Sequence, residues 1–270
     1  MTPCERFAGP RPIALSDVTL PASLRIAVTA PHPDDFDVIA IAMRTLHANG
    51  NAIALAVLTT GASGVDDGFG GAHTPDAKAR IREAEQRASC TLFGLDPAHV
   101  EFLRLADGAD GHIDTAGDNR AAVREFLLRV RPDIVFLPHG QDSNVTHQRT
   151  HAIVTDIVAA DRLSLMACLN EDPKTLGIRR DLVVEFDDAG AEWKARLLRL
   201  HASQQARNRR VRGDGLDGRI LSMNRRAAAV PGGAESYAEV FELACYHRGV
   251  LVNQVVRSGP PGNADLPPTV

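Results

Sequence analysis

The sequence predicts an α/β protein in which helices flank a doubly wound, mostly parallel sheet, followed by a less regular C-terminal part. Three observations support this fold class. Short, continuous apolar runs are typical of strands that are covered on both faces. Segments with the length and pattern of helices stand between these runs. The resulting order of strand, helix, strand and helix is typical of βαβ units, which build parallel sheets.

The first half of the chain carries this alternation most regularly. Asp37 is expected to cap a helix that runs to about residue 49, because Gly50 follows it as a C-terminal stop. A second helix is expected from about Pro75 to Phe93, ending near Gly94, and a third over 119–130. The predicted strands of this half are 24–30, 52–60, 100–105 and 133–138.

The second half is less regular. We expect a helix over 147–160, a strand over 181–186 and an amphipathic helix over 191–203. Residues 206–234 are rich in Arg and Gly and are predicted to form a loop or flap. The absence of an internal repeat and of a low-complexity linker favours a single domain over 1–270, with a core of about 22–205 and a C-terminal flap or subdomain of about 206–270.

Charge and hydropathy exclude several classes of partner. The 270 residues carry a formal net charge of −4, which offers no attraction for nucleic acid or an acidic membrane. No apolar run reaches ~18 residues, so no transmembrane helix is expected. The N-terminal residues lack the basic start and apolar stretch of a secretion signal. We therefore expect a cytoplasmic protein, and a homo-oligomer is compatible with the sequence.

The cysteine pattern points to the same compartment. Cys4, Cys90, Cys168 and Cys245 are widely scattered and form no C-x-x-C pair. This pattern predicts free thiols in a reducing cytoplasm, and neither a disulfide framework nor a cysteine zinc site.

Polar loops follow four of the predicted strands. P-H-P-D-D (31–35) follows the first strand, T-T-G-A-S-G (59–64) the second, L-A-D-G (105–108) the third and P-H-G-Q-D-S-N-V-T-H (138–147) the fourth. In an open parallel sheet the binding crevice lies at the carboxyl ends of the strands. All four loops are therefore expected to open on one edge of the sheet, where they would form a site.

The first of these loops has two interpretations. Prolines and aspartates end strands and start helices for ordinary backbone reasons, so P-H-P-D-D could be a plain turn. Imidazole nitrogen and carboxylate oxygen are also zinc ligands, so His32 and Asp35 could hold a metal. Two ligands are too few, since catalytic zinc usually takes three protein ligands and a water.

The loop after the fourth strand could supply the third ligand. His147 and His151 are four residues apart and would share one face of a helix. Their spacing also matches the H-E-x-x-H zinc-peptidase signature, but Gln148 stands where that signature has its basic glutamate. An amide cannot accept the proton, which argues against a peptidase. His151 is better explained by packing than by ligation.

Together these stretches resemble a known family. P-H-P-D-D, followed over 100 residues later by D-x-N-x-x-H, is similar to the metal motifs of the PIG-L / LmbE-like N-acetylglucosaminyl deacetylases. The order of the remaining segments agrees. T-T-G-A-S-G (59–64), I-R-E-A-E (81–85), F-L-R-L-A-D-G (102–108) and L-H-A-S-Q (200–204) resemble further segments of the family, so the likeness spans roughly 24–245.

The resemblance implies a Rossmann-like fold and zinc-dependent removal of an acetyl group from an amino sugar. Carried over by position, it makes His32, Asp35 and His147 the ligands of Zn²⁺, or of another divalent ion such as Fe²⁺. It makes Asp34 the general base toward a metal-bound water. Arg82 and Asp107 match family positions near the crevice and are candidates for substrate binding. Arg82 could instead pair with Glu85 on its helix, and Asp107 could cap a turn.

The chain departs from the family pattern at several positions. Asn144 replaces a histidine that polarises the substrate carbonyl or protonates the leaving amine, and Thr146 replaces the aspartate before the ligand. Asn144 can donate a hydrogen bond to an oxyanion but cannot supply a proton, so Asp34 would have to act as both base and acid. The glutamate that commonly follows P-D-D is Phe36, and Ala62 or Ser63 replaces the loop glutamate.

The sequence thus predicts a zinc-dependent hydrolase that removes an acyl group from a small N-acetylated amino sugar or glycoconjugate. Two alternatives stay open. Phe36 and the divergent 61–71 loop would permit a metal-dependent amidase that acts on a non-sugar amide. A non-catalytic Rossmann-like binding protein would keep the fold without the chemistry.

An arginine cluster with two possible interpretations follows the last predicted helix. Arg207, Arg209, Arg210 and Arg212 could clamp a phosphate or an acidic sugar, or they could form a solvated face.

Overall fold

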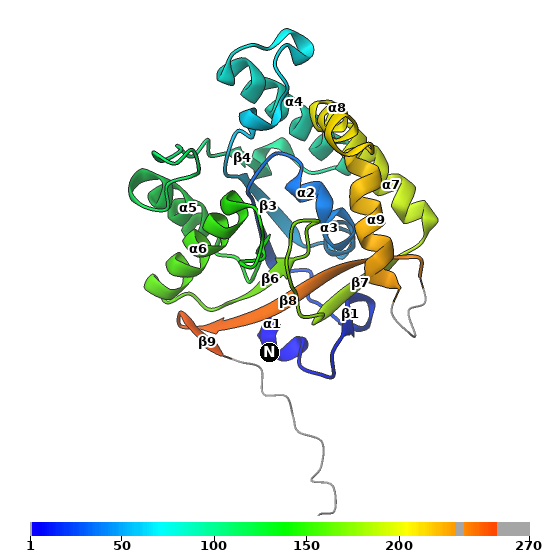
Figure 1. The fold of residues 1–270 in the computed structure, drawn as a ribbon. Helices are drawn as coiled ribbons and strands as arrows, with labels where there is room; N and C mark the ends of the chain where they lie inside the picture. Colours follow the sequence, from blue (N-terminus) through cyan, green and yellow to red (C-terminus); the bar gives the residue numbers. More distant parts are fainter. Residues whose placement is uncertain (1, 230–234, 253–270) are drawn as a thin grey trace, which may run out of the picture.

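A mixed β-sheet runs through the part of the chain that this computed structural model describes, residues 2–229 and 235–252 (Figure 1). The order of the strands is β1-β7-β8-β6-β5-β2-β3-β4, and β9 pairs with β8. Its strands are β1 (Ile13–Ala14), β2 (Arg25–Ala30), β3 (Ala52–Val57), β4 (Val100–Phe102), β5 (Ile134–Pro138), β6 (Leu165–Asn170), β7 (Leu182–Phe186), β8 (Tyr237–His247) and β9 (Val250–Val252).

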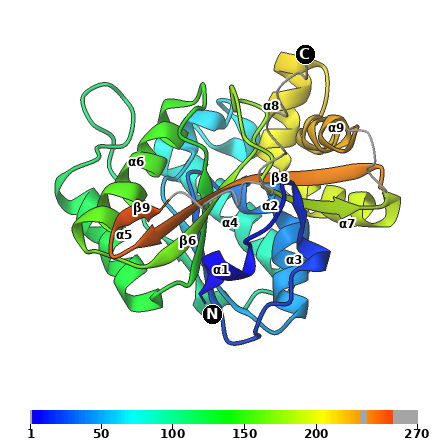
Figure 2. The same cartoon turned by 90° about the horizontal axis from the view of Figure 1, so that it is seen from below.

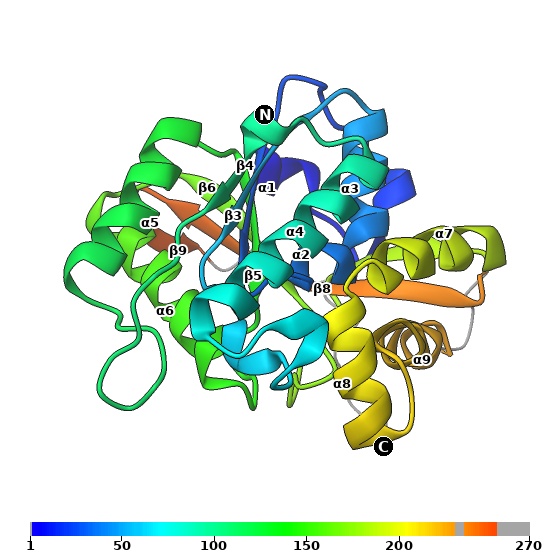
Figure 3. The same cartoon turned by 90° about the horizontal axis from the view of Figure 1, so that it is seen from above.

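Helices cover both faces of this sheet. In Figure 3, α5 and α6 lie on one face, while α3, α4 and α7 lie on the other. Ile26 and Val28 of β2 pack in the core under α3, whereas Ala27 packs toward α5 and α6. The helices are α1 (Pro3–Arg6), α2 (Asp35–Val38), α3 (Ala40–Ala48), α4 (Pro75–Phe93), α5 (Gly117–Val130), α6 (Val145–Ala160), α7 (Asp188–Arg199), α8 (Ala202–Arg212) and α9 (Leu216–Ala228).

The sequence signals for α4 illustrate how local chemistry fixes these helices. Thr74 precedes the helix, and its side chain accepts a hydrogen bond from the amide of Ala77 at 3.2 Å. Pro75 takes the first helical position, where it loses no hydrogen bond. Gly94 ends the helix with φ +93°, a conformation that glycine adopts without strain. Both predicted ends of this helix are confirmed.

Five neighbouring strands, in the order β6-β5-β2-β3-β4, are all parallel. From β2 the chain continues outward through β3 and β4 on one side, and through β5 and β6 on the other. The order therefore reverses between β2 and β5, which pair in register from Ile26 opposite Ile134. A reversal of this kind opens a crevice between the two loops that leave the strands. The predicted Rossmann-like α/β fold class is confirmed.

Four of the described strands were not predicted from the sequence: β1, β6, β8 and β9. β6 follows α6 and extends the parallel part of the sheet. β8, the long strand that crosses Figure 2, inserts between β6 and β7 and is antiparallel to both. The C-terminal part thus shares the sheet of the core, which supports the single-domain interpretation; that interpretation stays a prediction.

The predicted loop or flap over 206–234 is wrong for its described part. Helix α8 ends at Arg212, and α9 follows after a short turn at Gly213. The predicted helix over 191–203 is also divided, because α7 ends at Arg199 and α8 begins at Ala202. Arg and Gly content suggested a loop, but both helices are held by tertiary packing. Residues 230–234 and 253–270, which also belong to the predicted C-terminal flap or subdomain, lie outside the described residues.

Asp37 does not cap a helix as predicted. The chain forms the short helix α2 and then turns at Ile39 into α3. The Asp37 side chain is fully buried and accepts a hydrogen bond from Ser89 at 2.7 Å. The Nε2 atom of His201 lies 2.5 Å from the same carboxylate oxygen. Asp37 therefore joins α2 to α4 and to the start of α8.

A buried ion pair replaces the missing helix cap of α3. The Glu239 carboxylate, from β8, accepts hydrogen bonds from the amides of Ile41 and Ala42 at 2.9 and 2.8 Å. Lys194 Nζ lies 2.7 Å from the same carboxylate and donates to the carbonyl oxygen of Val38 at 2.6 Å. Burial lowers the pKa of Lys194, although Glu239 opposes that shift. The pair thus fixes the segment that follows the P-H-P-D-D loop.

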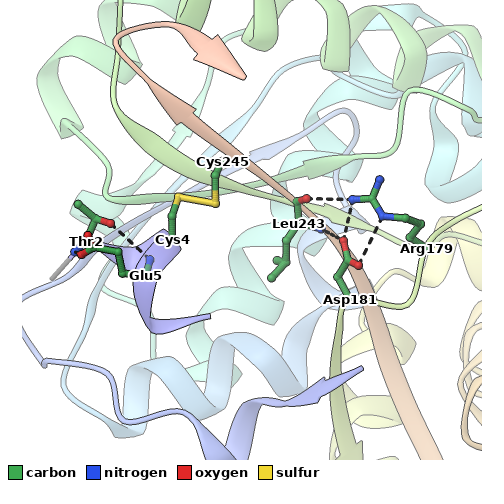
Figure 4. Close-up of a disulfide and its surroundings, with 7 residues drawn as sticks. All are labelled: Thr2, Cys4, Glu5, Arg179, Asp181, Leu243 and Cys245. Carbon is green, nitrogen blue, oxygen red and sulfur yellow. Dashed lines mark hydrogen bonds and ion pairs between the residues drawn. A yellow bond between two sulfur atoms is a disulfide. The ribbon is translucent and has the colours of Figure 1, made fainter. Parts of the chain in front are cut away.

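The prediction that all four cysteines are free thiols is wrong for two of them. Cys4 of α1 and Cys245 of β8 form a disulfide (Figure 4). They are 241 residues apart, so no short cysteine spacing pointed to this pair. Cys90 and Cys168 are free and buried. The cysteine argument for a reducing compartment therefore applies only to these two.

None of the helices in the described residues is both long enough and apolar enough to cross a membrane.

We predict that replacing Glu239 by Gln destabilises the protein strongly. The change leaves Lys194 fully buried with a positive charge that has lost its counter-charge. Breaking a buried pair of this kind costs about 3–5 kcal/mol of unfolding free energy. Urea unfolding followed by circular dichroism measures this loss.

The matched control is Glu101→Gln, which breaks the half-exposed pair with Arg129. A surface pair contributes at most about 1 kcal/mol. Equal losses in the two variants would contradict the structural role given to Glu239.

Candidate functional site

A cavity of about 700 Å³ opens at the carboxyl ends of the parallel strands. Every one of the four predicted polar loops contributes to its wall, so the predicted shared edge is observed. Helices α4 and α8 complete the wall. The lining residues used below are His32, Asp34, Ser63, Gly64, His73, Lys78, Arg82, Asp107, His112, Asn144, Thr146, Gln204 and Arg207.

Three predicted ligands come together at the switch point of the sheet. His32 follows β2, Asp35 begins α2, and His147 lies in the first turn of α6. His32 Nδ1 lies 3.2 Å from Asp35 Oδ2, and His147 Nε2 lies 3.7 Å from the same oxygen. One potential ligand atom from each residue lies within 4.8 Å of the others. The three side chains could therefore hold one metal ion.

Asp142 fixes the orientation of His147. Its Oδ2 atom lies 3.1 Å from His147 Nδ1, which donates the hydrogen bond to the carboxylate. A carboxylate in this position fixes the tautomer of a metal-binding histidine and leaves Nε2 with its lone pair. Nε2 is buried and has no hydrogen-bond partner in the described residues. A buried, unpartnered nitrogen next to Asp35 is what a metal ligand requires, so the residues fit a divalent ion.

The charges of this cluster shift one another. Burial by itself would raise the pKa of Asp35, but His147 and His32 outweigh it, and the pKa lies below its ordinary value. Burial lowers the pKa of His32. Burial also opposes the charge on His147, but Asp35 and Asp142 prevail, and its pKa lies above the ordinary value. Asp35 is thus ionised, and His147 must lose a proton before it binds a metal.

Asp172, a further buried carboxylate next to His147, was not predicted from the sequence. Asp172 follows β6, and together with Asp142 and His147 it forms another group whose ligand atoms lie within 4.8 Å of one another. Burial raises the pKa of Asp172. Its position at the carboxyl end of a parallel strand could have identified it as a site residue, but that strand, β6, was not predicted.

Asp34 has an unusual backbone next to the three ligands. Its φ of +116° lies in a region that is strained for residues other than glycine. Gln86 accepts a hydrogen bond from its amide at 2.9 Å, and Arg82 Nη2 donates to its Oδ1 atom at 3.1 Å. Arg82 also donates to the carbonyl oxygen of Pro33. Helix α4 therefore holds Asp34 at the cavity wall.

Arg82 does not pair with Glu85, the alternative that its helix spacing allowed. Glu85 accepts hydrogen bonds from the amide and the hydroxyl of Ser203 at 2.7 and 2.6 Å. Arg82 is 2% exposed, yet it lines the cavity beside Asp34. Asp107 also lines the cavity, and its backbone forms an isolated bridge with Ile113.

Asn144 combines a structural role with a free donor. It caps α6, because its Oδ1 atom accepts a hydrogen bond from the amide of Thr146 at 2.9 Å. This bond fixes the amide so that Nδ2 is the remaining donor. Nδ2 has no hydrogen-bond partner in the described part of the chain, and Asn144 lines the cavity.

Other sequence candidates lie outside the site. His151 packs against Gly140 and belongs to neither potential metal group, as its packing interpretation predicted. Phe36 is fully buried and meets the ring of Phe93 edge-on, with centroids 5.1 Å apart. The departure at Phe36 is therefore a core substitution and does not widen the cavity.

The fold and the cavity define an α/β protein with a cavity at the switch point in the parallel part of its sheet. Residues 27–158 match the family model described as "PIG-L: GlcNAc-PI de-N-acetylase". The resemblance inferred from the motifs is thereby confirmed, and the match identifies a hydrolytic N-deacetylase. No curated protein matches the chain.

Several solved structures share the fold. N,N'-diacetylchitobiose deacetylase from Pyrococcus horikoshii superposes with a TM-score of 0.66 at 20% identity, covering 83% of this chain and 84% of that one. A deacetylase of teicoplanin biosynthesis gives 0.62 at 14% identity, with 85% and 99% covered. GalB, the 4-carboxy-2-hydroxymuconate hydratase of Pseudomonas putida KT2440, gives 0.62 at 16% identity, with 90% and 100% covered. At these identities the likeness establishes the fold alone.

We predict that the purified chain binds one divalent ion and that binding weakens as the pH falls. The proton competes with the metal for His147, whose pKa is raised. Below that pKa the affinity should drop about tenfold per pH unit, because one ligand must be deprotonated. Zinc titration against a competing chelator between pH 8 and pH 6 measures this slope.

The variant His147→Ala should lose this binding, whereas His99→Ala, which changes an exposed histidine, should keep it. Affinity that is independent of pH, or that survives in His147→Ala, would remove His147 from the ligand set.

Proposed function

We propose that the chain is a metal-dependent N-deacetylase that removes the acetyl group from a small N-acetylated amino sugar or glycoconjugate. His32, Asp35 and His147 would hold the ion, and Asp34 would be the general base. The proposal rests on one observation: the three ligand atoms lie within 4.8 Å of one another beside Asp34, at the wall of a cavity. The family match supports the reaction class.

The donor set suits Zn²⁺, because two imidazoles and one carboxylate leave a position open for substrate or water. When bound, such an ion would polarise the acyl oxygen and acidify a water molecule. The remaining steps fall to the side chains. Asp34 lies beside the ligands without sharing their cluster, and Arg82 holds its carboxylate in place. The Asp34 carboxylate can accept the proton of the attacking water and then donate it to the leaving amine.

Asn144 has the properties of an oxyanion donor. Its Nδ2 atom is directed by the cap that its Oδ1 atom makes, so the donor is positioned before the substrate binds. It cannot supply a proton, which leaves Asp34 as the acid for the amine. Asn144 would therefore take over the electrostatic role of the family's histidine at this position, but not its role as a proton donor.

The structure bears on both alternatives, the non-sugar amidase and the non-catalytic binding protein. A non-sugar amidase was suggested by Phe36 and by the divergent 61–71 loop. Residues 61–64 of this loop line the cavity, but Phe36 lies in the core and lines no part of it. A non-catalytic binding protein has no need for a strained Asp34 beside three convergent ligand atoms. Both observations favour the deacetylase. Cytoplasmic location stays part of the proposal.

The decisive test is release of a free amine from a panel of N-acetylated amino sugars and simple amides. We expect turnover with the sugars after zinc loading. In Asp34→Asn the turnover should fall about 10²–10⁴-fold, the usual contribution of a general base. Zinc content, measured by atomic emission, should not change.

A fully active Asp34→Asn variant would show that another group is the base. Turnover of simple amides alone would favour the non-sugar amidase.

We further predict that Asn144→Ala lowers kcat by about 10²–10³-fold, the loss typical of one oxyanion donor. Because Asn144 also caps α6, Asn144→Ser serves as the matched control, since serine caps well but is too short to place the donor. Steady-state kinetics and zinc content are measured for both. Loss of zinc from both variants would mean that Asn144 supports the ligands and not the reaction.

A further inference from the structure

One wall of the cavity carries positive charge. This wall is formed by the loop after β3, by α4 and by α8, which lie together in Figure 3. Lys78 projects from α4, and Arg207 from α8. The acidic residues that line the cavity are Asp34 and Asp107, and Asp34 is already paired with Arg82. The lining therefore has an excess of cationic groups.

Arg207 is held in place by a backbone carbonyl; the carboxylate of Asp66 acts on it electrostatically but forms its hydrogen bonds with Arg210. Its Nη1 atom donates to the carbonyl oxygen of Ser63 at 3.1 Å, and it forms no ion pair in the described residues. The neighbouring Gln204 donates to the carbonyl oxygen of Gly64 at 2.9 Å, which ties α8 to the same loop. A guanidinium has five donors, so most of those of Arg207 stay available to a ligand.

The other arginines of the cluster differ from Arg207. Arg210 is bound by Asp66, with N–O distances of 2.8 and 2.6 Å. Arg209 is exposed and does not line the cavity. The two interpretations of the cluster thus apply to different members: Arg209 belongs to a solvated face, and Arg207 to the cavity.

Lys78 adds a second positive charge to the same wall. Its side chain is 17% exposed, and Nζ lies 3.2 Å from Asp67 Oδ1. Asp67 is 68% exposed and also contacts His73, so solvent screens this carboxylate. The positive charge of Lys78 is therefore only partly neutralised by Asp67 and can also attract an anionic ligand in the cavity.

We propose that Arg207 and Lys78 bind an anionic substituent of the substrate, a phosphate or a carboxylate. This inference rests on the proposed function and narrows its substrate class to N-acetyl amino sugars that carry such a group. A guanidinium matches phosphate and carboxylate oxygens in a bidentate manner, and the lysine supplies a point charge. The cavity volume lies within the range that holds a small ligand of this size.

The test compares neutral and anionic sugars on the zinc-loaded protein. The probes are N-acetylglucosamine, its 1-phosphate and 6-phosphate, and N-acetylmuramic acid, which carries a carboxylate. We expect kcat/KM for at least one anionic probe to exceed that of N-acetylglucosamine by about tenfold or more, as a charge-assisted hydrogen bond allows.

Arg207→Gln should remove most of this preference through a rise in KM for the anionic probe. Lys78→Gln should remove part of it. Arg209→Gln, on the same helix, is the matched control and should behave as wild type. Equal kcat/KM for neutral and anionic sugars, or the same loss in Arg209→Gln as in Arg207→Gln, would overturn the inference while leaving the deacetylase intact.

Failure to deacetylate any sugar would refute the proposed function. A binding measurement would still test whether Arg207 and Lys78 bind an anionic group. Isothermal titration calorimetry with the same probes should give tighter binding of an anionic sugar to wild type than to Arg207→Gln. Equal affinities of the two proteins for every anionic probe would overturn the inference on its own.

Discussion

The site depends on the reversal of strand order between β2 and β5. Two parallel neighbours whose chains continue to opposite sides leave their carboxyl-end loops diverging, and the gap between these loops is where a ligand can enter. His32 and Asp35 come from one loop and His147 from the other. More than a hundred residues separate these ligands in sequence, and only the pairing of β2 with β5 brings them together.

A second group of contacts keeps the loop after β2 in its strained form. Helix α4 supplies Arg82 and Gln86, which hold the backbone and carboxylate of Asp34. One turn further along the chain, Asp37 is bound by Ser89 of α4 and by His201. Strain at Asp34 persists because the surrounding polar contacts determine its position. The geometry of the candidate site is thus a property of packing between α2, α4 and α8.

The sequence predicted the first half of the fold well, because its strands are short apolar runs and helices such as α4 carry their own start and stop signals. It also predicted that His32, Asp35 and His147 lie close together, since polar loops after parallel strands must share an edge and the family resemblance selects these three residues. It missed β6, and with it Asp172. It misjudged α8 and α9, whose Arg and Gly content suggested a loop. In the structure α9 packs on α7 and β8, and α8 packs on α9, α4 and the loop after β3.

The remaining misses share one physical cause. The Cys4–Cys245 disulfide, the Asp37–His201 contact and the Arg82–Asp34 pair join residues that are far apart in sequence. No local pattern encodes such pairs, because each depends on which elements the sheet places side by side. The Arg207 position shows the same limit: composition identified an arginine cluster, and only the packing of α8 on the loop after β3 separates its members.

The central claim is that His32, Asp35 and His147 form the metal centre. Anomalous diffraction at the zinc absorption edge, on crystals of the zinc-loaded protein, tests it most directly. We expect one strong peak within bonding distance of these three side chains, next to Asp34. A peak among Asp142, His147 and Asp172, or no peak at the switch point of the sheet, would contradict it.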